Sequence, residues 1–330
     1  MNYIDLHLHL DGSQTAQSLL EIARADGVPL PARTAEELEP LISVTPDCTS
    51  LNDYLDRFAL PLTILQSARA LETAAYNLML QLKEKGLLYA EIRFAPSLHG
   101  RNGLSQEGAV QAALAGVRRG TEVTGLPAQL ILCAMRAPQS AERDASYRET
   151  VRLAASYLGR GVCCFDLAGA EALWPNTEFA DLFAYGRELG VPFVVHAGEA
   201  AGPESVRAAV EAGARRIGHG VTAVQDSSLL PLLRERGVTV EVCVTSNLHT
   251  RAVLRAEDHP LRQLLEAGVP VCLNTDNMTV SHTDMAAEFA LARSALGLTE
   301  SEIALLQRNA VQAAFLPEAE KAALLTALGL

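Results

Sequence analysis

Two kinds of apolar pattern alternate along this chain. Short segments are apolar at almost every position, and longer segments between them have apolar residues recurring every three or four positions. The short segments predict buried strands, and the longer ones predict helices with one buried face. The predicted strands are Ile4–Leu10, Leu87–Ala95, Gln129–Met135, Gly161–Ala168, Pro192–His196, Arg215–His219, Thr239–Thr245 and Pro270–Thr275.

Boundary residues support this alternation in the second half of the chain. The helical segment Ser205–Ala212 has Pro203 near its start and Gly213 after its end, and Leu261–Ala267 stops at Gly268. A further helical pattern at 227–236 likewise stops at a glycine. Repeated strand–helix units predict parallel strands. Eight of them in succession favour an α/β fold closed into a (β/α)8 TIM barrel over an open doubly wound sheet.

One connection is much longer than the others. Asp11–Gly86 separates the first two strands and contains helical patterns at Thr15–Ala25, Ser50–Gln66 and Ala70–Lys85. Structure inserted after a barrel strand lies at the C-terminal face, where it can form a lid or a pocket wall, or remain a surface elaboration. Because no linker-like or repetitive tract interrupts the chain, we expect residues 1–330 to form one domain with a helical insertion at about 11–86.

Composition narrows the class of protein. The chain has 330 residues, 49% of them hydrophobic, and a formal net charge of -12, which argues against nucleic acid as a partner. The start of the chain lacks the pattern of a signal peptide, and no apolar run approaches the length of a membrane span. The six cysteines form no C-x-x-C pair. We therefore expect a cytoplasmic protein with reduced, buried thiols and no membrane partner.

Polar residues gather at the C-terminal ends of the predicted strands. His7 and His9, two positions apart on the first strand, point to the same face. Such a pair is half of a metal site or simply two polar residues of a strand. His196, His219 and Asp276 end three other predicted strands. Because these ends meet at one face of a parallel barrel, the residues are expected to lie together.

The residue types in this group suit a metal ion. Three imidazoles, from His7, His9 and His196, and the carboxylate of Asp276 would form a mononuclear site with room for a water molecule. Zinc is expected, with one ion per chain, although nickel, cobalt or iron would accept the same ligands. A two-metal site bridged by a modified lysine on the fourth strand is excluded, because the three lysines all lie elsewhere.

The same face carries two candidate acid–base groups. Glu199 follows His196 by three positions and could exchange a proton with a substrate, and His219 could orient a water molecule. The remaining histidines lie in loops or at helix starts and are expected at the surface or the pocket rim. They are His99, His249, His259 and His282.

Seven segments, in order along nearly the whole chain, resemble the adenosine deaminase family of the amidohydrolases. They are Asp5-Leu6-His7-Leu8-His9-Leu10-Asp11-Gly12, Tyr89-Ala90-Glu91-Ile92-Arg93-Phe94-Ala95-Pro96, Phe165-Asp166-Leu167-Ala168-Gly169, His196-Ala197-Gly198-Glu199-Ala200, Arg216-Ile217-Gly218-His219-Gly220, Thr245-Ser246-Asn247 and Asn274-Thr275-Asp276.

The resemblance implies a zinc-dependent barrel that hydrolyses adenosine or 2'-deoxyadenosine to inosine or 2'-deoxyinosine and ammonia. It implies that His7, His9, His196 and Asp276 hold the zinc. Glu199 would protonate the purine N1, and His219 with Asp276 would orient and deprotonate the zinc-bound water. The H-x-E and P-C-x-x-C signature of cytidine-type deaminases is absent.

The resemblance also implies the substrate contacts. Asp11 would bond the ribose, and the Gly169 N–H would meet the purine N3. Relatives often place an acidic residue opposite N7, where this chain has Asn277. An amide donates at any pH, whereas a carboxyl donates only when protonated, so the contact can be kept. Many relatives also have an acidic residue after Gly169, where this chain has Ala170 before Glu171, which leaves the hydrogen bonding of that turn open.

Several alternatives share the same metal site. The substrate could be another 6-aminopurine, such as adenine, a 5'-modified adenosine or aminofutalosine, and AMP is disfavoured because the insertion is poor in positive charge. A non-deaminating amidohydrolase acting on an ester or a lactone would use the same fold. A catalytically inactive nucleoside-binding protein is disfavoured by the complete set of site residues. The oligomeric state is not indicated.

Overall fold

The computed structural model describes residues 2–330 and contains all eight of the predicted strands. Strands β1 to β4 form one sheet and β5 to β8 a second, and neighbours within each sheet are parallel. The strands are β1 Tyr3–His9, β2 Leu87–Phe94, β3 Ala128–Met135, β4 Val162–Ala168, β5 Val194–Ala197, β6 Arg216–His219, β7 Thr239–Val242 and β8 Val271–Leu273.

Backbone contacts at both edges close the two sheets into a (β/α)8 barrel. On one side the His9 N–H donates to the Asp276 carbonyl at 2.7 Å, and the Asp276 N–H donates to the His7 carbonyl at 2.7 Å. On the other side the Phe165 N–H donates to the Pro192 carbonyl at 3.2 Å. The seam between β1 and β8 thus runs through three of the predicted metal ligands.

Two strands end two or more residues before the C-terminal end that the sequence predicts. Strand β7 ends at Val242 rather than Thr245, because the following residues form a short helix, α11 (Val244–His249). Strand β8 ends at Leu273 rather than Thr275, and the chain then turns at Asp276, whose φ of +61° is rare for a residue with a side chain. Both corrections place polar residues in turns at the C-terminal face.

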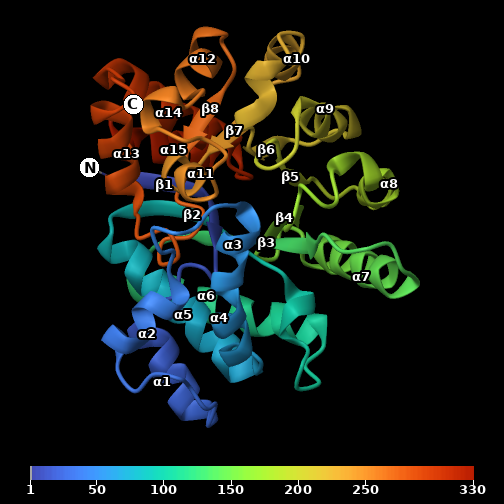
Figure 1. The fold of residues 1–330 in the computed structure, drawn as a ribbon, viewed down its shortest axis with the longest axis vertical. Coiled ribbons are helices and arrows are strands. Elements are labelled where there is room, and N and C mark those ends of the chain that lie inside the picture. Colours follow the sequence, from blue (N-terminus) through green and yellow to red (C-terminus); the bar gives the residue numbers. More distant parts are fainter. Residues whose placement is uncertain (1) are drawn as a thin grey trace.

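Helices follow the strands and surround the barrel (Figure 1). Several begin at a serine or threonine whose side chain accepts a hydrogen bond from the first turn, as at Ser105, Ser140 and Thr299. Besides α11, the helices after β2 are α6 Gln106–Thr124, α7 Ala141–Tyr157, α8 Ala180–Glu188, α9 Pro203–Ala212, α10 Leu229–Glu235, α12 Leu261–Glu266, α13 Met285–Ser294, α14 Glu300–Ala313 and α15 Glu318–Leu328. Short 3-10 turns lie at Pro96–His99, Asn176–Glu178, Val221–Gln225 and Ala256–Asp258.

The long connection after β1 is helical, in more pieces than predicted. Its helices are α1 Ala16–Asp26, α2 Ala35–Ile42, α3 Leu51–Leu55, α4 Ala59–Ile64 and α5 Ala68–Glu84. The pattern at 50–66 divides into α3, a 3-10 turn at Asp56–Phe58 and α4, which contains Pro61. Proline has no N–H to continue the helical hydrogen bonds, which accounts for the irregularity.

Helix α5 anchors this connection to the barrel by packing closely on α6. A Cβ on Gly116 would lie 2.2 Å from the Glu72 carbonyl oxygen, and one on Gly120 would lie 2.3 Å from the Met79 Cβ. Only glycine permits this approach of the two helices, and the buried face of α5 joins the main hydrophobic core. The helices of the connection are therefore packed on a rigid support.

The apolar content of the helices and the state of the cysteines can be compared with what the composition predicts. Across residues 2–330, no helix is long and apolar enough to cross a membrane. All six cysteines are buried and free, which agrees with the expected reduced thiols.

Candidate metal centre and active site

The predicted metal ligands converge at the C-terminal face of the barrel. His7 and His9 come from β1, His196 from β5, and Asp276 from the turn after β8. The Nε2 atom of His9 lies 3.3 Å from the Nε2 atom of His196 and 3.3 Å from Oδ1 of Asp276. The Nε2 atom of His7 lies 3.5 Å from the same oxygen.

These separations fit a tetrahedral metal site. Ligands about 2.0–2.1 Å from a zinc ion are about 3.3 Å from one another in a tetrahedron. Among residues 2–330, His7 Nε2 is buried with no hydrogen-bond partner, which is costly unless another atom satisfies it. The facing nitrogens of His9 and His196 also need a cation or a proton between them. The donor set thus fits a metal ion on chemistry and on spacing.

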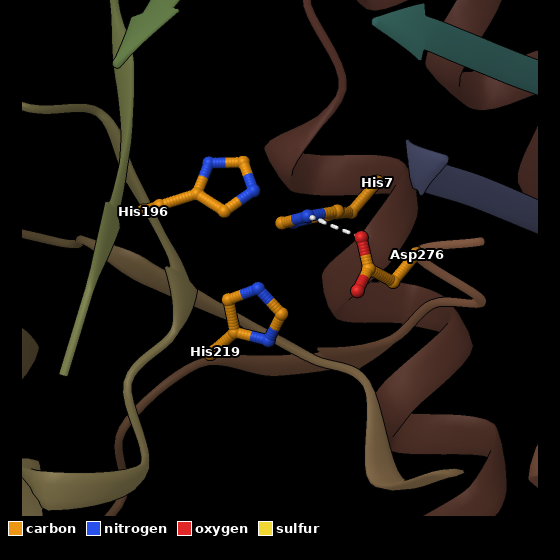
Figure 2. A group of neighbouring side chains, drawn as sticks. All are labelled: His7, His196, His219 and Asp276. Carbon is orange, nitrogen blue, oxygen red and sulfur yellow. Dashed lines mark ion pairs between the residues drawn. The ribbon is translucent and has the colours of Figure 1, made fainter. Parts of the chain in front are cut away.

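A second grouping overlaps this set. One donor atom from each of His7, His196, His219 and Asp276 lies within 4.8 Å of the others, and this group does not include His9. Figure 2 shows His7 next to Asp276 on one side of the group. The rings of His196 and His219 lie on the other side and point toward them. Both nitrogens of His219 have other neighbours, Asn247 at 3.0 Å and Glu199 at 3.6 Å, so we favour His9 as the ligand.

Buried carboxylates orient the imidazoles from behind. His7 Nδ1 donates to Glu241 at 2.8 Å, and His196 Nδ1 lies 2.9 Å from Asp166. Arg93 joins the two carboxylates with contacts of 2.9 Å to each. Such partners fix the ring orientation and leave the other nitrogen free for a metal. Sequence reasoning assigned no role to them, although a carboxylate within an apolar strand is a usable signal.

Positive charge keeps these carboxylates ionised. Burial alone would raise the pKa of Glu241, but Arg93, Arg216 and His7 outweigh it and hold the pKa well below its usual range. Burial would also raise the pKa of Asp166, but the nearby His196 and Arg93 outweigh this effect and lower that pKa. The Asp276 carboxylate receives a hydrogen bond of 2.6 Å from the Ser246 hydroxyl. The carboxylates that orient His7 and His196 are therefore negatively charged and paired with buried positive groups.

The surroundings of Glu199 favour the protonated form of its carboxyl group. Its side chain is buried beside the metal-ligand group, and burial together with the charges of Asp276 and Glu171 raises its pKa well above the usual value. Its Oε1 atom has no hydrogen-bond partner in the described part of the chain, and its Oε2 atom lies 3.6 Å from His219 Nε2. A neutral carboxyl in this position can give a proton to a bound molecule.

Glu171 holds the turn that carries Glu199. Its carboxylate accepts the backbone N–H groups of Gly198, Glu199, Ala200 and Ala201 at 2.8–3.2 Å, and the Ser205 hydroxyl at 2.7 Å. These contacts hold the turn after β5 and involve no residue at position 170. Sequence analysis gave Glu171 no role.

A pocket in front of the metal-ligand group contains all three predicted substrate-binding residues. Asp11, Gly169 and Asn277 line it together with Glu199. The opposite wall is apolar and comes mainly from the connection after β1, through Leu51, Tyr54, Leu55, Phe58 and Leu62. Among the described residues, no lysine or arginine lines this pocket.

Asn277 is closely packed against the turn after β1. A Cβ on Gly12 would lie 1.9 Å from Asn277 Oδ1, so only glycine leaves space for the amide. Among the described residues, Asn277 Oδ1 is buried without a hydrogen-bond donor.

The prediction for the other histidines is wrong for two of them. His99 and His259 are buried, with 0% and 4% of their surface exposed, whereas His249 is partly buried and His282 is exposed. His259 is buried because it supports the start of α12: its Nδ1 accepts the Leu261 N–H at 3.1 Å. The first N–H groups of a helix need such an acceptor.

A larger and more open cavity lies at the opposite end of the barrel. It is lined by residues at the starts of the strands, such as Val162 and Thr239, and by the C-terminal segment around Phe315. None of the predicted site residues lines it. The candidate site residues thus all lie at the C-terminal face, where active sites of such barrels form.

The fold and this donor set are typical of a metal-dependent hydrolase. A sequence model of the adenosine deaminase family matches residues 3–329, so the chain belongs to that family. The chain is 47% identical to the adenosine deaminase of Haemophilus ducreyi over 98% of this chain and 94% of that protein.

Solved structures are similar over the whole barrel. The adenine deaminase of Arthrobacter aurescens matches with a TM-score of 0.88 and 26% identity, over 98% of this chain and 97% of that one. The N6-mAMP deaminase of Arabidopsis matches with a TM-score of 0.85 and 27% identity, over 98% and 96%. This chain therefore shares its fold with deaminases that are named for different substrates, a free base in one case and a nucleotide in the other.

Proposed function

We propose that this protein hydrolyses the 6-amino group of adenosine and 2'-deoxyadenosine, releasing ammonia. The observation that carries the proposal is the position of the buried Glu199, whose pKa is raised by burial, beside the convergent group of His7, His9, His196 and Asp276. The identity of 47% to a named adenosine deaminase supports the same substrate.

The metal proposed for this site is zinc, one ion per chain, held by His7, His9, His196 and Asp276. Zinc would supply a water molecule made acidic enough to attack carbon at neutral pH. Glu241 and Asp166 hold the rings of His7 and His196 so that each presents its second nitrogen.

The protein groups around the pocket are proposed to bind and activate the purine. Glu199 gives its proton to N1, which makes C6 electrophilic. The Gly169 N–H meets N3, the Asn277 amide donates to N7, and Asp11 bonds the ribose. All four residues line the same pocket.

The closest rival is deamination of another 6-aminopurine, such as adenine, a 5'-modified adenosine or aminofutalosine, because a structural relative is named an adenine deaminase. Asp11 in the pocket favours a nucleoside, and the absence of basic residues among the described lining disfavours a 5'-phosphate. Hydrolysis of an ester or a lactone is disfavoured by the combination of Gly169, Glu199 and His219 at one pocket.

We also infer the organisation of the chain and its setting. Residues 1–330 are proposed to form one domain, with 11–86 as the insertion that supplies the apolar pocket wall. The six buried free thiols support a reducing, cytoplasmic location. Neither nucleic acid nor a membrane is proposed as a partner, given the net charge of -12.

The test is a panel of adenosine, 2'-deoxyadenosine, adenine, AMP and aminofutalosine, followed by ammonia release from zinc-loaded protein. We expect the highest kcat/KM with adenosine and about one zinc per chain by elemental analysis. No ammonia from any member of the panel would refute the deaminase proposal. Two zinc ions in one pocket would refute the mononuclear site.

A further inference from the structure

A chain of buried hydrogen bonds leads from the start of α12 to His219. The Leu261 N–H meets His259 Nδ1 at 3.1 Å, and His259 Nε2 meets Asn247 Oδ1 at 3.2 Å. Asn247 Nδ2 then meets His219 Nδ1 at 3.0 Å. His259, Asn247 and His219 are 4%, 0% and 1% exposed, so water does not compete for these contacts.

The first contact determines the direction of all the others. A backbone N–H can only donate, so His259 Nδ1 must accept, and the proton of this neutral ring is on Nε2. His259 Nε2 therefore donates, and the Asn247 atom that faces it must be the oxygen. The Asn247 NH₂ group is then left to face His219, whose Nδ1 must accept. It follows that His219 carries its proton on Nε2.

Burial also favours a neutral ring at the start of this chain. It lowers the pKa of His259 to about 4, so the ring is uncharged near pH 7. The backbone holds His219 in place as well. Its φ is +66°, and it is flanked by Gly218, where a Cβ would lie 2.8 Å from the His7 ring. The imidazole is thus fixed both in direction and in tautomer.

We propose that Asn247 and His259 are positioning residues that hold His219 as a hydrogen-bond donor, with its Nε2–H directed at the reacting atoms. His219 Nε2 faces the pocket and lies 3.6 Å from Glu199. A nitrogen that already carries a proton cannot take another from water, so the base is the Asp276 carboxylate. This assignment rests on the proposed deamination and narrows the role that family resemblance gives to His219.

The proton transfers of the attack step then balance without His219. One O–H bond of the attacking water breaks and its proton goes to Asp276, while the oxygen bonds to C6 of the purine. The electron pair displaced from the ring goes to N1, which receives the proton of Glu199. His219 donates a hydrogen bond to the attacking oxygen and keeps its own proton throughout.

The direct test reads the tautomer without any turnover. Zinc-loaded protein labelled with ¹⁵N-histidine is recorded by NMR near pH 7, and His219 is assigned by comparison with His219→Asn. We expect a protonated, pyrrole-type Nε2 and an unprotonated, pyridine-type Nδ1 at His219. The reverse pattern would overturn the proposal, whether or not any aminopurine is a substrate. Ammonia release decides the proposed function separately.

A kinetic test uses the isosteric variant Asn247→Asp. A carboxylate only accepts, so it still receives the His259 proton but draws the His219 proton to Nδ1. Loss of one donor to the reacting oxygen typically lowers the rate about 10²–10³-fold, and we expect this loss in kcat with KM changed less than about 3-fold. The ¹⁵N spectrum should show the two His219 nitrogens exchanged. Wild-type kcat with exchanged nitrogens would refute the donor role.

Variants of His259 keep the proposal testable if Asn247→Asp does not fold. His259→Phe removes the donor to Asn247, and we expect a lower kcat and a mixture of His219 tautomers. His259→Gln can still accept from Leu261 and donate to Asn247, so it should recover most of the kcat. Equal kcat values for the two variants, with His219 unchanged in both spectra, would overturn the role of His259.

Discussion

Replacing Glu171 by glutamine tests how the turn carrying the proposed acid is held. The carboxylate accepts five donors, four from the backbone of Gly198–Ala201 and one from Ser205. Glutamine has one accepting oxygen, and its NH₂ group would face donors in whichever orientation it adopts. The less costly orientation places the NH₂ toward Ser205, whose hydroxyl can rotate, and leaves the Gly198 N–H without an acceptor.

The expected loss follows from these contacts. One buried N–H without an acceptor costs about 1–3 kcal/mol, and the other bonds weaken because the acceptor is no longer charged. We therefore expect a loss of about 2–5 kcal/mol in the free energy of unfolding. With an unfolding entropy of about 2.1 cal/mol/K per residue, this corresponds to a fall in Tm of roughly 3–7 °C. Calorimetry of zinc-loaded protein measures it.

The same variant should shift the pH dependence of deamination. Glu199 acts while protonated, so activity falls as pH rises through its pKa. Burial is the main cause of the raised pKa, and the negative charge of Glu171 adds to it. Removing that charge lowers the pKa and moves the alkaline limb of kcat/KM to lower pH. Glu178→Gln, an exposed glutamate nearby, is the matched control. An unchanged Tm and alkaline limb in Glu171→Gln would refute the reasoning.

Three further substitutions test single contacts. Glu199→Gln removes the proton donor, so kcat should fall at least about 10²-fold while zinc content stays near one per chain; turnover near the wild-type rate would exclude Glu199 as the acid. Asn277→Asp should make kcat/KM fall with rising pH as the new carboxyl ionises and can no longer donate to N7. An unchanged pH profile would argue against that contact. Ser246→Ala leaves Asp276 Oδ2 without its 2.6 Å donor and should weaken zinc binding about 10–100-fold in a competition titration with a chelator. An unchanged zinc affinity would show that Ser246 does not support the metal site.

The sequence alone predicted the repeated strands of the barrel and the site residues that lie at the ends of those strands. Continuous apolar runs predict the eight strands because both faces of a barrel strand are buried. His7, His196 and Asp276 could be grouped without coordinates, since parallel strands bring their C-terminal ends to one face. The predicted end of β7 was wrong because a short helix follows the strand, and that of β8 was wrong because polar residues that favour a turn follow it directly.

Partners that depend on folding across the chain could not be predicted in this way. Glu171 contacts a turn more than 25 residues later, and nothing in its local pattern marks it as buried. His259 looked like a loop residue because Pro260 and the start of α12 follow it. The buried supports Asp166 and Glu241 are different, since each interrupts an apolar strand. A charge there requires a partner, and that requirement is readable even when the partner is not.

The interior of this barrel contains a network of buried charged side chains, and its contacts indicate their role. Most barrels of this type fill the interior with branched apolar side chains. Here Arg93 contacts Glu241 at 2.9 Å, and Arg216 contacts Glu241 and Glu91 at 2.5 Å each, all essentially without exposure to water. A buried ion pair rarely adds stability over apolar residues of the same size, because desolvation offsets the attraction. Stability alone therefore does not explain the network. Glu241 also accepts the Nδ1 proton of His7, and fixing that ring toward the metal-ligand group is the effect that apolar residues could not reproduce.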